Sequence, residues 1–541
     1  MDSNNAVSGS VSRPRSKPEE ESLRETLVSI LIAFVLAFVF RSYVVEPFVI
    51  PTGSMAPTLL GAHMEFHSPY SGYSWTTNPR DFVDGRNDKP LPLQGRRDSS
   101  GGGHIAVTDP MSGLGLAQFD VPAKAGDRIL VLKYLYAVRS PKRWDVVVFK
   151  NPEQPQQNYI KRLVGLPNEE LWIADGDLFT RAANTDDNWS VARKPNRIQR
   201  ALWRTLYSSE WAPRVDEHDG VAWRGPWEAA GVRTAGQAYR MVADDNGASV
   251  LRWNSADWPI TDETTYNETY RMTNIKRYPI SDLRMRAVIT PDESEAFTAT
   301  ASLLIRGQEF QAVLGESGVT IRQRSAPTAD DSAIAPAGEI DWATLATSTK
   351  RVFASGDAAT VEFWHADQRL SVWIDGKEVC AAEYDWSPME RIENVTGMEV
   401  TQLGTAYTSV RSSNLSRPGV YRRPIVSWRF TGSDATLTRV GLDRDLYYQP
   451  ARAPSRATTP ETVFTLGSDQ FFTLGDNSAA SKDGRMWTHV DPWIAELFDP
   501  TVGVVHRDLM MGQAFFVYFP SPRKAMGKVP VPNFGEMRFI R

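Results

Sequence analysis

Residues 26–40, TLVSILIAFVLAFVF, contain no charged side chain, and this run most constrains how the chain can fold. As a helix, the fifteen residues would be about 22 Å long, which is short of the ~30 Å hydrocarbon core of a bilayer. Continuing the helix through Val45 gives roughly twenty residues, with Arg41 reaching back to the headgroups. We therefore expect a single transmembrane anchor over residues 23–45.

A cleaved signal peptide is the alternative interpretation of this run. No small-x-small cleavage site follows it, which favours an uncleaved anchor. Basic residues mark the cytoplasmic side of such a segment. Four of them precede the run and one follows it closely: Arg13, Arg15, Lys17, Arg24 and Arg41. We expect residues 1–22 to be a disordered cytoplasmic tail and the rest of the chain to be exported.

A serine turn follows the expected anchor, where residues 51–60 read PTGSMAPTLL. An extended apolar run turns sharply at Pro51 and Gly53, and the glycine allows another segment to approach closely. The turn presents Ser54, which could be a nucleophile, a helix N-cap or a turn hydroxyl. This stretch alone leaves the three interpretations open.

Residues 126–133 and 143–149 are short apolar or β-branched runs entered through polar turns, which predicts two strands. A third strand is expected over residues 158–167, where Lys161 stands between Ile160 and Leu163. Such a lysine usually lies on a strand face with its amine in water. The alternative is a buried amine with a lowered pKa, which could act as a base.

Residues 176–465 differ in composition from the rest of the chain and hold twelve of the seventeen tryptophans. Many short segments alternate between apolar and polar residues, and 35 prolines and 37 glycines in the chain indicate frequent turns. The run VEFWHADQRLSVWIDGKEV, residues 361–379, predicts consecutive hairpins that turn at Ala366–Asp367 and Asp375–Gly376. We expect an inserted antiparallel β-sandwich.

An apolar strand enters a polar loop over residues 471–487, FFTLGDNSAASKDGRMW, and residues 512–519 predict a last core strand. Taken alone, the polar side chains of this loop could simply stabilise a turn. The net charge of −5 and seven scattered histidines predict neither nucleic-acid binding nor a metal site. The single cysteine, Cys380, is expected in the core.

In combination these segments resemble bacterial type I signal peptidases, which are membrane-anchored serine-lysine proteases. The matching blocks are the anchor, FVIPTGSMAPTLL, GDRILVLK, RWDVVVF, NYIKRLVGLPNE and GDNSAASKDGR. The resemblance covers residues 27–60, 122–175 and 468–525 and implies a mainly β fold. The catalytic core would comprise residues 46–175, with an irregular stretch at 61–122, and residues 466–541. A single-pass location in the bacterial cytoplasmic membrane is also implied, with lipid contact.

The resemblance also implies chemical roles for residues of three blocks. Ser54 would be the nucleophile and Lys161 the general base, which acts only when its amine is neutral. The oxyanion would be held by the Ser54 N–H and the Thr52 hydroxyl. The last block would supply a lysine-orienting hydroxyl and a buried pair that supports the loop: Ser481, Asp483 and Arg485.

Signal-peptide-bearing preproteins with small-x-small sites are the implied substrates, and no metal or other cofactor is implied. Five residues match the shallow apolar pockets of the family: Phe48, Ile50, Leu59, Tyr159 and Ile160. Two departures stand in the loop, where GDNSAAS lacks the usual charged residue after the asparagine and Gly484 replaces a usual serine.

The inserted region resembles concanavalin A-like jelly rolls, chiefly in RLSVWIDGKEV and in residues 436–448. Such modules bind carbohydrate or protein, or serve as spacers and gates. The alternative function is therefore a membrane-anchored binding protein in which an idle peptidase core is the scaffold. A self-cleaving serine-lysine repressor is a weaker alternative, because the chain shows no DNA-binding helix pair.

Overall fold

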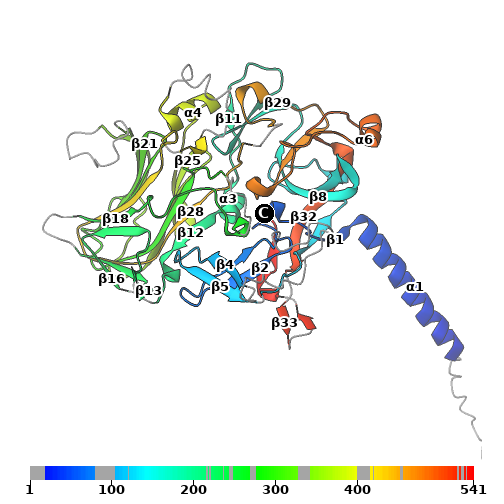
Figure 1. The fold of residues 1–541 in the computed structure, drawn as a ribbon, viewed down its shortest axis with the longest axis horizontal. Coiled ribbons are helices and arrows are strands. Elements are labelled where there is room, and N and C mark those ends of the chain that lie inside the picture. Colours follow the sequence, from blue (N-terminus) through cyan, green and yellow to red (C-terminus); the bar gives the residue numbers. More distant parts are fainter. Residues whose placement is uncertain are drawn as a thin grey trace, which may run out of the picture.

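Two β-rich bodies lie side by side in the computed structural model, and one long helix projects from one of them (Figure 1). The structure describes residues 19–79, 104–119, 121–214, 217–218, 221–235, 237–242, 248–268, 276–326, 341–398, 415–417, 419–450, 455–520, 523–525, 529–531 and 533–541.

The projecting helix is α1, Glu19–Tyr43. Its exposed large apolar side chains include Leu27, Val28, Ile30, Leu31, Ile32, Phe34, Val35, Leu36 and Phe38. Its charge-free run is only fifteen residues long. Within the described part of the chain, no helix combines the length and apolar character needed to cross a bilayer. The transmembrane anchor expected over residues 23–45 is therefore not supported. Of the tail expected over residues 1–22, residues 19–22 belong to α1 and residues 1–18 lie outside the description.

The core sheet has the order β1-β6-β32-β7-β8-β30-β31, with β35 paired to β32. Its strands are β1 Val45–Val49, β6 Arg128–Leu132, β7 Val146–Asn151, β8 Gln154–Gly165, β30 Gln470–Leu474, β31 Val505–His506, β32 Met510–Phe519 and β35 Arg538–Phe539. The strands expected from the sequence at 126–133, 143–149, 158–167, 471–474 and 512–519 all lie in this sheet. Since β32 lies between β6 and β7, the sheet is completed only by chain that follows the insertion.

A four-stranded sheet links this core to the insertion in the order β11-β10-β9-β29. Its strands are β9 Glu169–Ala174, β10 Asp177–Ala182, β11 Ser190–Val191 and β29 Phe464–Thr465. The start of the expected insertion, residues 177–191, is thus paired through β10 with β9, and β9 also pairs with β29 at the end of the expected insertion.

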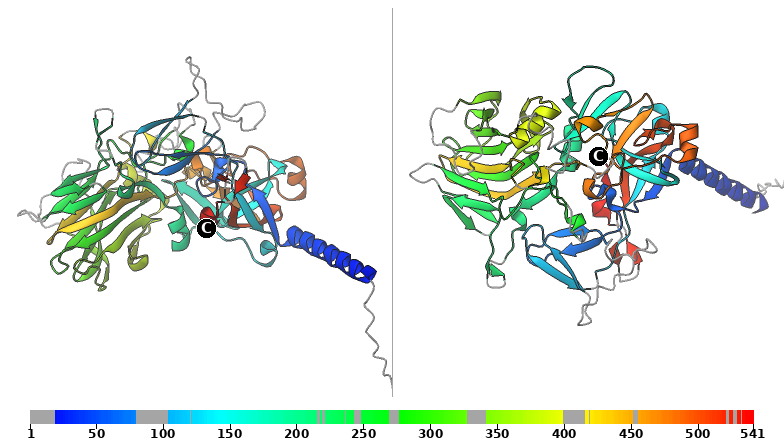
Figure 2. Two further views of the ribbon diagram at one scale, coloured as in Figure 1. Left: turned by 90° about the horizontal axis from the view of Figure 1, so that it is seen from below. Right: turned by 45° about the horizontal axis from the view of Figure 1, so that its top comes forward.

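The insertion is a sandwich of two antiparallel sheets, as the alternating segments predicted (Figure 2). The first sheet contains β12 Arg204–Ser208, β16 Val232–Ala235, β17 Ala238–Met241, β19 Leu283–Pro291, β24 Ala359–Ala366, β25 Arg369–Ile374, β26 Lys377–Glu383 and β28 Ala435–Arg444. The second contains β15 Trp227–Ala230, β18 Ser249–Trp253, β20 Thr298–Ile305, β21 Gln308–Gly315, β22 Gly318–Ser325, β23 Ala343–Ser348 and β27 Ile425–Thr431.

Alternation along each strand buries one face of each sheet, and β19 is buried at every second residue. The buried side chains of both sheets form one apolar core, which includes Phe297, Phe363, Trp428 and Cys380. The expected turn at Asp375–Gly376 is present, with positive φ at both residues. The other turn lies at Asp367–Gln368, one residue later than expected.

Four short strands occupy the described part of the stretch expected to be irregular, residues 61–122. They form the hairpins β2 Met64–His67 with β3 Ser74–Thr77, and β4 His104–Thr108 with β5 Gly115–Phe119. The two hairpins share a small core that includes Phe66, Trp75 and Val107. They also contact the insertion, because Trp223 Nε1 donates to the carbonyl of Ser112 at 2.8 Å.

The remaining elements are short. They are α2 Leu135–Val138, α3 Asn196–Leu202, α4 Pro388–Thr396, α6 Pro492–Leu497, the strand pairs β13 Glu217–His218 with β14 Val221–Ala222 and β33 Arg523–Ala525 with β34 Val529–Val531, and the single-turn helices η1 Gly53–Met55, η3 Ser209–Trp211, η4 Thr265–Asn267, η6 Pro460–Thr462, η7 Ser478–Ala480, η8 Arg507–Leu509 and η9 Phe534–Glu536.

Candidate active site

Ser54 and Lys161 meet where the turn after β1 crosses β8. Ser54 lies in η1, which is closed by a hydrogen bond from the Ala56 N–H to the Gly53 carbonyl. Lys161 lies on β8 opposite Val147 of β7. Its Nζ donates to Ser54 Oγ at 2.5 Å, and the two residues are only 4% and 8% exposed. The structure thus brings together two residues that stand 107 positions apart in the sequence.

Burial lowers the pKa of Lys161 to about 8, since an ammonium group loses its hydration there. The carboxylates of Asp483 and Asp476 oppose this shift, whereas Arg485 adds to it. A pKa of about 8 leaves roughly a quarter of the lysine neutral at pH 7.5, against about one part in a thousand for an ordinary lysine. A neutral Lys161 amine at this distance has the chemistry to accept a proton from the Ser54 hydroxyl.

A buried ion pair organises the loop after β30. Arg485 donates through Nε and Nη2 to both carboxylate oxygens of Asp483, at 2.9 and 2.8 Å. The Gly475 N–H donates to the same carboxylate at 3.1 Å. Burial alone would raise the pKa of Asp483, but Arg485 holds it below its usual value. This carboxylate therefore stays charged and ties the two ends of the loop together.

Ser481 lies in the same loop without the hydrogen bond to Lys161 that the resemblance implies. Its hydroxyl is buried and, among the described residues, has no hydrogen-bond partner. It packs against Gly475, where an added Cβ would lie 2.3 Å from the Ser481 Oγ. The Ser478 hydroxyl, in contrast, is hydrogen-bonded within the loop and accepts from Arg485 Nη1 at 2.7 Å.

The expected substrate-contacting residues fall into two groups. Thr52 is exposed at the start of η1, and Phe48, Tyr159 and Ile160 are half-buried. Ile50 and Leu59 are only 2% and 0% exposed, and they pack in the apolar core with Ile129, Val131 and Val146. Ile50 and Leu59 therefore lie below the protein surface, whereas the other four side chains are at least partly exposed.

Two residues of the loop carry contacts that the sequence interpretation left without a role. The Asn477 N–H donates to the Ser54 carbonyl, and Asn477 Nδ2 donates to the Gly53 carbonyl, both at 3.0 Å. Asp476 accepts from Arg162 Nε and Nη2 at 2.8 and 2.7 Å. The loop is thereby fixed to the serine turn and to the residue beside Lys161. Both residues stand in the GDN sequence that was recognised as a block.

The insertion also reaches the site. Asn267 exchanges two hydrogen bonds with the Asn477 side chain, at 2.7 and 2.9 Å. Arg204 Nη2 donates to Thr58 Oγ1 at 2.7 Å, and that hydroxyl donates to Asp476 at 2.6 Å. No local pattern in residues 204 or 267 indicates these contacts, because they arise only when the sandwich packs on the core.

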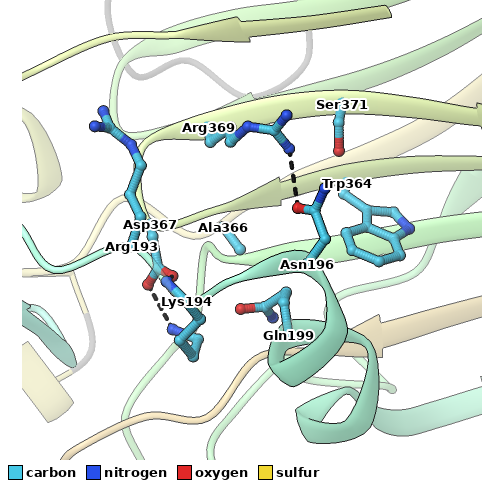
Figure 3. A pocket seen from close by; sticks show the side chains of 9 residues that line it. All are labelled: Arg193, Lys194, Asn196, Gln199, Trp364, Ala366, Asp367, Arg369 and Ser371. Atoms are coloured by element: carbon cyan, nitrogen blue, oxygen red, sulfur yellow. Dashed lines mark hydrogen bonds and ion pairs between the residues drawn. The ribbon is translucent and has the colours of Figure 1, made fainter. Parts of the chain in front are cut away.

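A second group of polar residues lines a pocket on the insertion (Figure 3). Figure 3 shows Lys194 paired with Asp367 and Arg369 paired with Asn196. The pocket adjoins four buried carboxylates whose oxygens lie within 4.8 Å of one another: Asp177, Asp282, Asp367 and Asp445. They are ion-paired with Lys194, Arg306 and Arg391, so protein cations already occupy the positions around them.

Comparison with known families points to the same core. The family model described as signal peptidase, peptidase S26, matches residues 23–83 and 121–214. Signal peptidase I of Rickettsia massiliae is 29% identical over 141 residues, covering 26% of this chain and 36% of the relative. That of Pseudomonas fluorescens is 35% identical over 86 residues, covering 14% of this chain and 30% of the relative.

The chain thus spans about a third of the length of these curated relatives. The matches support the signal peptidase family, which is a family of serine endopeptidases, for this part of the chain. The matched ranges contain both Ser54 and Lys161.

Solved structures similar to this chain include the carbohydrate binding module CBM66 from Bacillus subtilis. Its TM-score is 0.23 at 9% identity, covering 40% of this chain and 95% of that one. Sheep galectin-11 has a TM-score of 0.18 at 8% identity, covering 31% and 91%.

Proposed function

We propose that this protein is a serine endopeptidase of the signal peptidase I type, with Ser54 as nucleophile and Lys161 as general base. The observation that carries the proposal is the 2.5 Å hydrogen bond between Lys161 Nζ and Ser54 Oγ in a buried setting. A serine hydroxyl is a weak nucleophile until a base removes its proton, and a buried lysine near pKa 8 can do so.

The reaction proceeds in two halves. Ser54 Oγ attacks the scissile carbonyl carbon while Lys161 takes its proton. Lys161 then gives that proton to the leaving amine, and the C–N bond breaks to leave an ester on Ser54. Lys161 next removes a proton from water, which attacks the ester carbon. The bond between that carbon and Ser54 Oγ breaks, Lys161 returns the proton to Ser54 Oγ, and the new carboxyl end leaves. The Ser54 N–H and the exposed Thr52 hydroxyl are the proposed donors to the oxyanion.

The proposed substrates are preproteins with small-x-small cleavage sites, which an extended chain would present to Phe48, Tyr159 and Ile160. Ile50 and Leu59 are buried in the apolar core against which Phe48 and Ile160 pack, and the pocket at this surface is proposed to be shallow. Such a surface selects small residues by excluding larger ones. Lipid contact through the exposed apolar side chains of α1 is part of the proposal.

The test is cleavage of a preprotein with an Ala-x-Ala site, in detergent, by the intact chain and by Ser54→Ala. The intact chain is expected to release the signal peptide, and the variant is expected to lose at least about a thousandfold in rate because the attacking oxygen is gone. A folded intact chain that cuts none of several such preproteins would instead favour the alternative, an idle core that presents a binding module.

A pH dependence follows from the lowered pKa of Lys161. The base is active when neutral, so kcat/KM is expected to rise with pH and to level off above a midpoint of about 8. The profile is measured with the Ala-x-Ala preprotein between pH 6 and 10 (roughly the range over which a lysine of this kind titrates). A rate that stays flat across this range, or falls as pH rises, would contradict Lys161 as the base.

A further inference from the structure

We propose that Asn267 of the inserted sandwich is a positioning residue of the active site. It fixes the side-chain amide of Asn477, which in turn holds the peptide unit that carries the Ser54 N–H. This inference rests on the proposed function, because it assigns a role in the reaction that Ser54 performs. The insertion would then contribute a residue that positions the active site.

The contact between the two asparagines is reciprocal and buried. Asn267 Nδ2 donates to Asn477 Oδ1 at 2.7 Å, and Asn477 Nδ2 donates to Asn267 Oδ1 at 2.9 Å. Asn477 uses its other Nδ2 hydrogen to bind the Gly53 carbonyl at 3.0 Å. Both amide hydrogens of Asn477 and one lone pair of its oxygen therefore have partners.

The Gly53 carbonyl sets which way the Asn477 amide faces, and Asn267 holds the amide in place with two hydrogen bonds. If that amide turned over, its Oδ1 would face the Gly53 carbonyl and two acceptors would meet. With Asn267 unchanged, its Nδ2 donor would also face the Asn477 Nδ2 donor; if both amides turned together, the bond to the Gly53 carbonyl would still be lost in a buried place. Without Asn267, the Asn477 side-chain amide would keep only its bond to the Gly53 carbonyl and would be less firmly held.

Asn477 acts on the Ser54 N–H through a planar peptide. The Gly53 carbonyl and the Ser54 N–H belong to one trans peptide unit, so they point in opposite directions. Asn477 Nδ2 and the Ala56 N–H both donate to this carbonyl, and together they set the direction of that N–H. The strength with which an N–H holds an oxyanion depends on its alignment, which makes this anchor matter most in the transition state.

The segment that carries Asn267 is itself tied to the core. Tyr266 packs on Gly53, where an added Cβ would lie 2.1 Å from the Tyr266 Cε1. The Tyr266 hydroxyl donates to the Ala62 carbonyl at 2.9 Å, and the Asn78 N–H donates to the Tyr266 carbonyl at 2.8 Å. Asn267 therefore approaches the loop from a fixed position.

The experiment measures kcat, KM and the pH profile of cleavage for the full chain and for Asn267→Ala, Asn477→Ala and the double variant. Losing an oxyanion donor lowers kcat by about a hundredfold or more, so misalignment of one is expected to lower it about tenfold. KM and the pH midpoint of about 8 are expected to stay unchanged in Asn267→Ala, because the contact between Ser54 and Lys161 is untouched. The double variant is expected to be no slower than Asn477→Ala.

Two further variants keep the result interpretable. Asn267→Asp retains the shape and the acceptor but not the donor, and it is expected to lower kcat in the same way even if the alanine variant folds poorly. Asn254→Ala is the matched control. Its side chain hydrogen-bonds Ala256, Asp257 and Glu228 within the insertion, so kcat is expected to be unchanged.

The outcomes separate the two proposals. An intact chain that cleaves, together with Asn267 variants of unchanged kcat, would overturn the positioning role alone. So would additive losses in the double variant, or an equal loss in Asn254→Ala. An intact chain without cleavage would overturn the proposed function and this inference with it.

Discussion

Replacing Lys161 with methionine is expected to lower kcat/KM on an Ala-x-Ala preprotein by about a thousandfold or more. Methionine fills nearly the same apolar space, so the variant tests the amine and not the packing. The only change at Ser54 is the loss of the nitrogen 2.5 Å from its hydroxyl oxygen. Activity within tenfold of the parent would contradict the proposed base.

Two companion variants sharpen this prediction. Lys161→Arg keeps a positive charge but does not release its proton near neutral pH. It is expected to be as inactive as the methionine variant if Lys161 acts as a base, and active if only its charge matters. Lys150→Met, on the neighbouring strand β7, changes a half-buried lysine and is expected to leave the rate unchanged.

Replacing Asp476 with alanine is expected to lower the free energy of unfolding of the core by about 3–5 kcal/mol. The change leaves the guanidinium of Arg162 buried without its carboxylate, and both side chains are 0% exposed. Thr58 loses its acceptor as well. The measurement is urea unfolding followed by tryptophan fluorescence, with Asp187→Ala on the surface as the control.

The paired change, Asp476→Ala with Arg162→Met, removes both charges together. It is expected to recover part of the lost stability, because no buried ion is then left unpaired. A loss of stability below about 1 kcal/mol for Asp476→Ala alone would contradict this prediction, because that is the contribution of an ordinary surface ion pair.

The strands of the core and the sandwich were predictable from alternating or continuous apolar runs between turns. β6, β7, β8 and β32 and the hairpins of β24 to β26 all lie where these patterns indicated. The hairpins β2–β3 and β4–β5 were missed, because strands of four or five residues bounded by glycine, proline and polar residues show too little periodicity. The transmembrane anchor was inferred from apolar character, although the charge-free run spans only fifteen residues.

The meeting of Ser54 and Lys161 could be anticipated only from the resemblance, since no spacing rule joins β1 to β8. The loop shows the limit of such an inference. Ser478 and Ser481 stand three positions apart, and the loop conformation, with η7 at Ser478–Ala480, turns Ser478 toward Arg485 and leaves Ser481 against Gly475. The contact of Asn267 with Asn477 had no sequence signal, because it depends on how two separately formed sheets pack.

The pairing of β29 with β9 has a consequence for the order in which this protein folds. Leu171 and Phe464 are neighbours in one sheet, yet about three hundred residues separate them, and closing an open chain of that length costs about 5 kcal/mol of entropy. A sandwich that folds first brings its two ends together and removes most of that penalty. We expect the insertion to form before the core sheet during refolding, so that the contact between Ser54 and Lys161 is among the last to appear. The nascent chain would then have no proteolytic activity until its final strands have joined the sheet.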